Sequence, residues 1–237
     1  MTPELIPLSR ALTKLGYCSR SRAADYIKSG RVSVNGEVTR LLSSRVDLDR
    51  DIIAVDRNRL SRPVRVVIML HKPRGFVTTS SDEFSRKTVY GLIPNDLHLF
   101  SVGRLDIDTT GLLLFTNDGT LQDKILSPEN EIAKTYIVTV NGKVTGEQIG
   151  KLMKGVEIRD GVICRADDCE IVETELSKTR LRIRIHEGKN REIRRMLDAI
   201  GKKVSRLHRT AIGGLELDVP EGAWRKLTDE EIKLILN

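Results

Sequence analysis

Cysteines and aromatic residues are scarce in this sequence. Its three cysteines are an odd number, and Cys164 and Cys169 form a lone C-x4-C with no second pair and no histidine nearby to complete a zinc site. We therefore expect reduced thiols that pack as small apolar side chains, and no metal. Aromatic residues are 4% of the chain, which disfavours a long stacking groove for single strands but leaves room for one or two rings at a pocket.

Long hydrophobic runs are missing as well. No segment approaches the roughly 18 apolar residues that a membrane-spanning helix needs, and residues 1–10 lack the apolar stretch of a secretory signal. The 237 residues, 39% hydrophobic and 31% charged, have the composition of a folded globular protein. We expect a cytoplasmic protein without membrane partners, built as one large domain or as a small and a medium one.

Positive charge is abundant but unevenly placed. Residues 1–65 hold 13 basic against 7 acidic side chains and residues 178–209 hold 12 against 3, although the net charge of the whole chain is only +7. Two basic segments on an otherwise acidic chain favour a polyanionic partner. The alternative is that both are solvated faces that bind nothing.

The N-terminal segment is patterned as two short helices followed by a hairpin. Leucines recur at helical spacing from Leu8 to Leu15, and Ser19 or Ser21 can cap a second helix that ends near Lys28. Residues 31–38 alternate around an Asn-Gly pair, which is typical of a two-residue hairpin turn, and residues 51–55 supply another strand.

The run LSRALTKLGYCSRSRAADYIKSGRVSVNGEV, within residues 8–55, resembles the alpha-L RNA-binding domain shared by ribosomal proteins and several RNA-modifying enzymes. A helix N-terminus with Arg20 and Arg22 is also a reasonable phosphate site on physical grounds, although such a basic helix can equally be solvated surface. The resemblance implies that RNA phosphates are bound by the following residues: Arg10, Ser19, Arg20, Arg22, Lys28 and Arg31.

Beyond this segment, strands and helices mix without regular alternation, which predicts an α+β domain. The polar segment 56–65 is expected to be the linker, so we divide the chain into domains 1–61 and 62–237. Strands are predicted at 66–70, 111–115, 136–140 and 181–185, with turns at 71–75 and 116–119. Helices are predicted at 191–200 and at 145–154, where Thr145 and Gln148 form a capping box.

Signature motifs of cofactor-dependent enzymes are absent. The sequence has no G-x-x-x-x-G-K-[ST] phosphate loop, no G-x-G-x-x-G and no zinc-deaminase pattern. Its four histidines show no ligand spacing. An RNA enzyme built on this sequence must therefore work with carboxylates, arginine and tyrosine, and we expect no cofactor.

Two segments carry candidate chemistry. The polar loop GRLDIDTT at 103–110 runs directly into an apolar strand, so Asp106 is held at the edge of a rigid element, although on its own it could be a turn residue or a surface partner of Arg104. In the helix REIRRMLDAIG, Arg194 lies at the seam of the apolar stripe, while Arg191 and Arg195 project from the opposite face. A partly buried Arg194 needs a carboxylate, which the Asp106 loop offers; otherwise it extends to solvent.

Five motifs, in order and at compatible spacing, resemble the RsuA family of ribosomal RNA pseudouridine synthases, whose members carry an N-terminal alpha-L domain. They are KPRGFVTT (72–79), GRLDIDTTGLLLFTNDG (103–119), KTYIVTV (134–140), EGKNREIRRM (187–196) and RLHRTAIGG (206–214). One departure is Glu192, where many relatives have glutamine. The resemblance implies the pseudouridine synthase fold, a mixed and largely antiparallel sheet with flanking helices.

The resemblance also implies roles for residues, carried over by position. Asp106 matches the essential aspartate that acts on the ribose, either by attacking the anomeric carbon or by removing the neighbouring sugar proton. Tyr136 matches the tyrosine that stacks on the flipped uracil and is positioned for proton transfer. Arg194 matches the arginine that pairs with the aspartate.

Four further residues are expected to meet the substrate. Leu207 matches an apolar residue packed against the base, and Arg104 resembles the residue that fills the gap left in the RNA. Arg191 and Arg195, next to Arg194, are expected to bind substrate.

We therefore predict a monomeric, cofactor-independent isomerase that converts a uridine of ribosomal RNA to pseudouridine, with free RNA or an assembling ribosomal subunit as its partner. The motifs LHRTAIGG and GAWRKLTDEEI favour small-subunit over large-subunit RNA. Two alternatives are a non-catalytic ribosome-assembly factor, against which the intact Asp106, Tyr136 and Arg194 argue, and a synthase for transfer RNA.

Overall fold

The computed structural model describes residues 5–18, 20–61, 64–94, 97–159 and 161–236. The chain forms two compact units. The first runs to Arg65 and includes Asn117–Thr120, and the second comprises Val66–Thr116 and Leu121–Asn237. Within the described ranges, no helix has the length and apolar character needed to cross a membrane.

The first unit packs two short helices on small sheets. Its helices are α1 (Leu8–Lys14) and α2 (Arg20–Lys28), and its strands are β1 (Ile6–Pro7), β2 (Val32–Val34), β3 (Glu37–Thr39), β4 (Arg45–Val46), β5 (Ile53–Val55) and β6 (Asn58–Arg59). Leu8, Leu12 and Ile27 are fully buried in a core that belongs to this unit alone. The order of two helices, hairpin and further strand is the one that the sequence predicts.

One expectation about this unit is wrong. The linker was expected to begin at residue 56, but β6 lies inside that segment and pairs with β5, with Asn58 opposite Val55. Asp56 and Arg57 both have positive φ, which forms the tight turn between the two strands. The polar, charged composition of residues 56–65 therefore does not distinguish an exposed hairpin from a linker.

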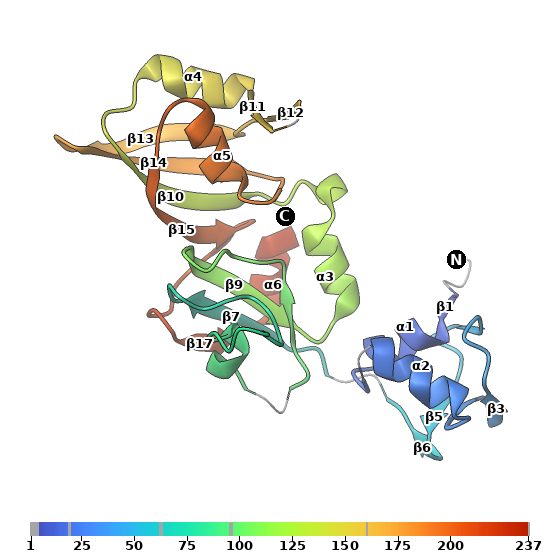
Figure 1. The fold of residues 1–237 in the computed structure, drawn as a ribbon. Helices are drawn as coiled ribbons and strands as arrows, with labels where there is room; N and C mark the ends of the chain where they lie inside the picture. Colours follow the sequence, from blue (N-terminus) through green and yellow to red (C-terminus); the bar gives the residue numbers. More distant parts are fainter. Residues whose placement is uncertain (1–4, 19, 62–63, 95–96, 160, 237) are drawn as a thin grey trace. The chain divides into compact units, whose positions relative to one another are not determined.

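The second unit is built on a nine-stranded sheet in the order β13-β14-β10-β15-β9-β7-β17, with β16 paired to β15 and β8 to β9 (Figure 1). The strands are β7 (Val67–Lys72), β8 (Phe100–Val102), β9 (Thr110–Thr116), β10 (Lys134–Asn141), β13 (Asp168–Thr174), β14 (Lys178–Ile185), β15 (Val204–Ile212), β16 (Leu215–Glu216) and β17 (Trp224–Lys226). The pairs are antiparallel except β9 with β15. This mixed, largely antiparallel sheet with flanking helices confirms the predicted fold.

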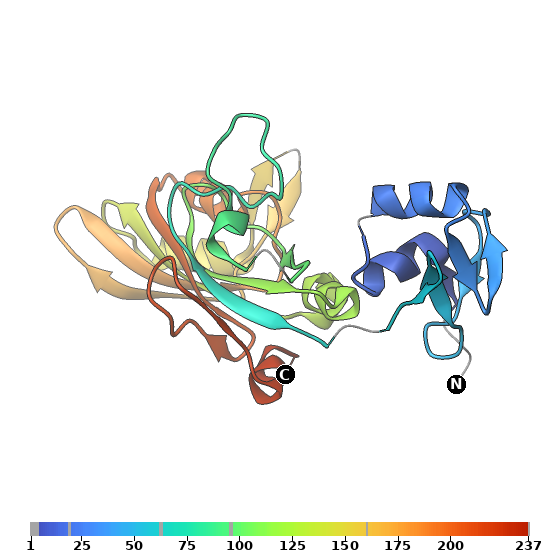
Figure 2. The same ribbon diagram turned by 90° about the horizontal axis from the view of Figure 1, so that it is seen from below.

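Helices cover both faces of this sheet. On β9, Leu113 and Phe115 pack in one core with α4 (Gly146–Lys154) and α5 (Glu192–Ala199), whereas Leu112 and Leu114 pack in another with α3 (Gly119–Leu126) and α6 (Asp229–Leu236). In Figure 2, α6 lies below the sheet and the segment between β7 and the 3-10 helix η1 (Val89–Leu92) arches above it. The remaining elements are the hairpin β11 (Val156–Arg159) and β12 (Val162–Cys164), and the 3-10 helix η2 (Pro128–Asn130).

The parallel pairing of β9 and β15 decides where functional side chains meet. His208 lies opposite Thr110, and Arg209 lies opposite Gly111. Gly111 has φ of 109°, and a Cβ added there would lie 2.2 Å from the Arg209 carbonyl oxygen, so only glycine permits this approach. Because β15 also pairs with β10, the loop that enters β9 lies beside the middle of both strands.

Candidate active site

The loop between β8 and β9, residues 103–109, is fixed by the segment that follows β7. Thr78 Oγ1 donates to the Leu105 carbonyl oxygen at 2.9 Å, and Gly75 N donates to the Ile107 carbonyl oxygen at 2.8 Å. Lys72 is fully buried at the end of β7 and donates from Nζ to the Thr109 carbonyl oxygen at 2.8 Å. The segments KPRGFVTT and GRLDIDTT are therefore joined by hydrogen bonds, which hold the loop that carries Asp106 in place.

Two arginines at the start of α5 face the carboxylates of this loop. Arg191 Nη1 lies 3.4 Å from Asp106 Oδ2, and Arg194 Nη2 lies 3.0 Å from Asp108 Oδ2. Arg194 Nε is farther from Asp106 Oδ2, at 3.9 Å. We expected Arg194 to pair with Asp106. In the structure Arg191 lies closer to Asp106 than Arg194 does, and the carboxylate closest to Arg194 is Asp108, which had no predicted role.

Arg194 points inward rather than to solvent. Its side chain is 9% exposed, and this burial lowers the pKa of the guanidinium, a shift that the nearby Asp108 opposes. Arg191 reaches the same loop because it precedes α5 in a left-handed conformation, with φ of 52°. Arg195 does not line the site; its Nη2 donates to Asn190 Oδ1 at 2.7 Å.

A cavity of about 1030 Å³ lies beside Asp106 and Arg191, and neither Arg194 nor Asp108 lines it. Asp106, Tyr136 and Leu207 line it, and so do Arg104 and Arg191. Tyr136 on β10 and Leu207 on β15 are largely buried and share one face of the sheet, whereas Arg104 is exposed. The volume suffices for a nucleotide. The structure thus brings Asp106, Tyr136, Leu207, Arg104 and Arg191 to one cavity.

The inner end of the cavity is basic, which the sequence did not predict. Arg209 is buried on β15, donates from Nε to the Leu112 carbonyl oxygen at 2.7 Å, and lies with Nη1 3.5 Å from Tyr136 Oη. Lys134 donates from Nζ to the His186 carbonyl oxygen at 2.7 Å, and burial lowers the pKa of Lys134. The available signal was a basic residue within an otherwise apolar part of a strand, as Arg209 is in β15.

Comparison with known proteins agrees with this geometry. Residues 66–199 match the family model described as RNA pseudouridylate synthase, and residues 6–52 match the S4 domain. The chain belongs to the RNA pseudouridylate synthase family. The S4 match covers most of the span in which the sequence resembles the alpha-L RNA-binding domain, so both resemblances are confirmed.

Individual relatives span nearly the whole synthase. It is 40% identical to an uncharacterized RNA pseudouridine synthase of Mycobacterium leprae, over 96% of this chain and 91% of the relative. It is 36% identical to ribosomal large subunit pseudouridine synthase B of Bacillus subtilis, over 95% of this chain and 93% of the relative. A crystal structure of a pseudouridylate synthase has a TM-score of 0.71 and 32% identity, covering 97% of this chain and 99% of its own.

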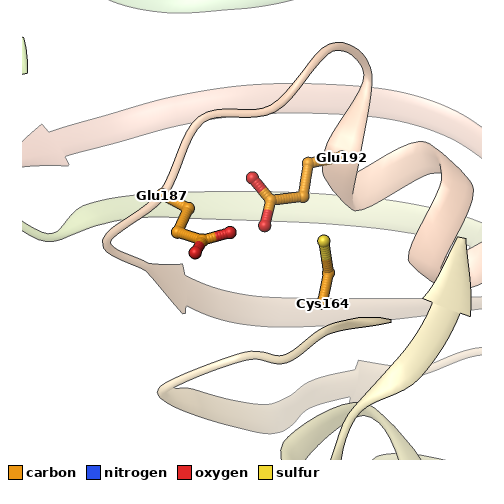
Figure 3. Close-up of side chains that lie close together, drawn as sticks. All are labelled: Cys164, Glu187 and Glu192. Carbon is orange, nitrogen blue, oxygen red and sulfur yellow. The ribbon is translucent and has the colours of Figure 1, made fainter. Parts of the chain in front are cut away.

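A cluster of Cys164, Glu187 and Glu192 lies where β12, the end of β14 and the start of α5 meet (Figure 3). Their ligand atoms lie within 4.8 Å of one another, but the ammonium group of Lys189 lies beside two of them. Lys189 forms an ion pair with Glu187 and its Nζ lies 3.6 Å from Cys164 Sγ. Burial raises the pKa values of the Cys164 thiol and the Glu192 carboxyl, which favours neutral forms that bind metals poorly. These contacts hold the loop before α5 in place, and they do not favour a metal site.

The predicted phosphate-binding residues of the S4 unit differ in their surroundings. Arg31 forms an ion pair with Asp56, and its guanidinium lies over the Tyr26 ring at 4.5 Å. Arg22 Nη2 lies 3.5 Å from Tyr26 Oη, and Lys28 is exposed at the end of α2. Arg10 is half-buried on α1. Ser19 lies outside the described residues, as does the side chain of Arg20.

Proposed function

We propose that the synthase isomerises a uridine of ribosomal RNA to pseudouridine, with Asp106 as the group that acts on the ribose. The observation that carries the proposal is the Asp106 carboxylate on a braced loop at the edge of the cavity that Tyr136 also lines. The adjacent guanidinium groups of Arg191 and Arg194 balance the charge of Asp106 and Asp108 once bound RNA excludes water.

The reaction needs no group beyond such side chains. The N1–C1′ bond of the uridine breaks, a C5–C1′ bond forms, and the proton lost from C5 is balanced by one gained at N1, so electrons are neither added nor removed. Asp106 either attacks C1′ or removes the neighbouring sugar proton. Tyr136 stacks on the detached uracil and Leu207 packs against it, which holds the base while it turns.

The uridine must leave the RNA stack to reach this cavity. Flipping costs a few kcal/mol, which favours irregular or loosely paired sites. Arg104, exposed on the cavity rim, is placed to fill the gap in the RNA. The basic segments of both units supply phosphate contacts that position the RNA, while the pocket selects uracil.

We propose large-subunit ribosomal RNA as the substrate. Relatives from Bacillus subtilis, Vibrio cholerae and Vibrio vulnificus that match 95% or 96% of this chain are named ribosomal large subunit pseudouridine synthase B. The motifs that favoured the small subunit lie in β15 and from β17 to α6. There Leu207 and Ile212 are buried in the sheet, and Ile232 in the core beneath it, so these motifs are needed by the fold for either substrate.

Release of tritium from C5-labelled uridine tests both parts of this proposal. Transcripts of large-subunit, small-subunit and transfer RNA are each incubated with the synthase, alone and in assembly particles. Release from large-subunit RNA is expected. Release only from one of the other RNAs would overturn the substrate assignment, and no release from any of them, despite tight binding, would overturn the proposed reaction.

A further inference from the structure

The segment between β7 and η1 forms a braced loop on the cavity rim. Its base is closed by two backbone hydrogen bonds, from Val77 N to the Lys87 carbonyl oxygen at 2.9 Å and from Val89 N to the Val77 carbonyl oxygen at 3.0 Å. At its tip, Asp82 Oδ2 accepts from Phe84 N at 3.2 Å and from Arg86 N at 2.8 Å. The loop arches over the sheet on the side away from α6 (Figure 2). Its conformation is therefore set by contacts of its own.

Phe84, at the tip of this loop, combines exposure with a place at the cavity. The residue is 75% exposed, although it lines the same cavity as Asp106 and Tyr136. The other three phenylalanines, Phe76, Phe100 and Phe115, are buried or half-buried. In a chain with few aromatic residues, a phenylalanine in water at the mouth of an RNA-modifying site offers a flat apolar face to whatever enters.

A cation backs the Phe84 ring. The Arg86 guanidinium lies 5.0 Å from the ring centroid, within the range of a cation–π contact. Asp82 holds the same guanidinium, with Arg86 Nη2 2.6 Å from Asp82 Oδ1. This bond lowers the pKa of Asp82 to about 2, so the carboxylate stays charged and the ion pair persists at neutral pH. The ring and its neighbouring charge are thus presented as one unit.

We propose that Phe84 stacks on a nucleobase of the substrate RNA next to the uridine that enters the cavity. The inference rests on the proposed function for the identity of its ligand. A flipped uridine leaves its neighbour with one unstacked face, and an aromatic ring at the cavity rim replaces the missing stacking. Every base has such a face, so Phe84 contributes to affinity and to holding the RNA open without selecting a sequence.

The test compares full-length wild type with Phe84→Ala, Phe84→Leu and Phe84→Trp, by fluorescence anisotropy on labelled large-subunit ribosomal RNA transcripts at several salt concentrations. The alanine and leucine variants are expected to bind about 5- to 150-fold more weakly, because each loses one stacked base. Tryptophan is expected to restore binding to within about twofold. The dependence on salt stays unchanged in all three, because no phosphate contact is removed.

Leu176→Ala is the matched control, because Leu176 is 97% exposed but does not line the cavity. It is expected to bind RNA as wild type does. Wild-type affinity in Phe84→Ala would overturn the inference, and wild-type affinity in Phe84→Leu would show an apolar contact without stacking, which overturns it as well. If wild type released no tritium, the proposed function would fail, but the affinities on the same transcripts would still decide the role of Phe84.

Discussion

Lys72 is the residue through which β7 holds the loop that carries Asp106. Its Nζ has the Thr109 and Pro73 carbonyl oxygens as acceptors, at 2.8 and 3.1 Å. Burial lowers the pKa of Lys72 from 10.5 to about 8, against the opposing effect of Asp108 and Asp106. A charged ammonium group in this position therefore depends on a pH below about 8.

We predict that Lys72 affects activity and stability in opposite directions above pH 8. Activity falls because the ammonium group beside the Asp106 loop loses its charge. The contribution of Lys72 to the unfolding free energy rises between pH 8 and 10.5, because in that window its amine binds a proton in the unfolded chain but not in the folded one. Single-turnover tritium release and urea unfolding over this range measure the two effects.

Lys72→Met removes the titrating group and the hydrogen bond together. We expect isomerisation at pH 7 to slow by about 10- to 100-fold, because the loop that carries Asp106 loses its anchor. The fall in activity above pH 8 should disappear in this variant, and the unfolding free energy of wild type should increase relative to that of Lys72→Met between pH 8 and 10.5. The same fall in activity above pH 8 in Lys72→Met would assign the pH dependence to another group.

Glu192 is a second buried titratable residue, 4% exposed, that accepts from Lys189 N at 2.8 Å. Burial raises the pKa of Glu192 above 4.5, so its contribution to stability is complete below that pH and is lost as the pH rises through the folded pKa. Glu192→Gln keeps an acceptor without the charge. We expect it to match wild type at pH 4 and to be more stable at pH 8.

The expected gain is about 1.4 kcal/mol for each unit by which the folded pKa exceeds the unfolded one. Urea unfolding at the two pH values measures it, with Glu187→Gln, a half-exposed neighbour, as the control. Equal stability of Glu192→Gln and wild type at pH 8 would contradict the assignment of burial as the cause.

At the scale of elements, the contact between β9 and β15 leaves no room for a side chain at Gly111. Gly111→Ala would place a Cβ 2.2 Å from one backbone atom of Arg209 and 2.6 Å from another, in a conformation with positive φ. We expect a loss of about 2 to 5 kcal/mol in the free energy of unfolding. Gly146→Ala, with no atom near the added Cβ, is the control and should stay near wild type in urea unfolding. A stable Gly111→Ala protein would contradict this packing.

Elements with strong local signals were predicted well. The capping box forms as expected, with Thr145 Oγ1 accepting from Gln148 N at 3.3 Å and Gln148 Oε1 accepting from Thr145 N at 3.1 Å. Several elements of the second unit were missed, among them α3, β13, β15 and α6. After its first two residues β13 is wholly exposed, so its sequence does not alternate, and β15 carries polar residues into the sheet beside the cavity. Their structure depends on neighbours distant in the sequence.

The candidate site divides in the same way. Asp106, Tyr136 and Leu207 belong to motifs that resemble the family, and the structure brings them to one cavity. Asp108, Lys72 and Arg209 could not be assigned from spacing, because their roles arise from contacts across 86, 37 and 73 residues of sequence. The role of a buried cationic side chain depends on which carbonyl, carboxylate or hydroxyl oxygen the fold places beside it.

At the scale of the whole molecule, the two units have separate cores. We assign phosphate binding to the S4 unit and the reaction to the second unit. We predict that a chain of residues 62–237 binds ribosomal RNA more weakly and with a smaller salt dependence than the full chain. Each phosphate group that the shorter chain no longer binds lowers the slope of log affinity against log salt by about 0.7 to 0.9. Its single-turnover rate at saturating RNA should be retained. An unchanged salt slope would contradict the role given to the S4 unit.

The central claim is that Asp106 performs the chemistry, and one measurement tests it most directly. Tritium release from C5-labelled ribosomal RNA is compared between wild type and Asp106→Asn, at RNA concentrations that give equal occupancy. Asp198→Asn, an exposed carboxylate on α5 that does not line the cavity, is the control. We predict release by wild type and by the control, and none above background by Asp106→Asn. Wild-type release by Asp106→Asn would contradict the account.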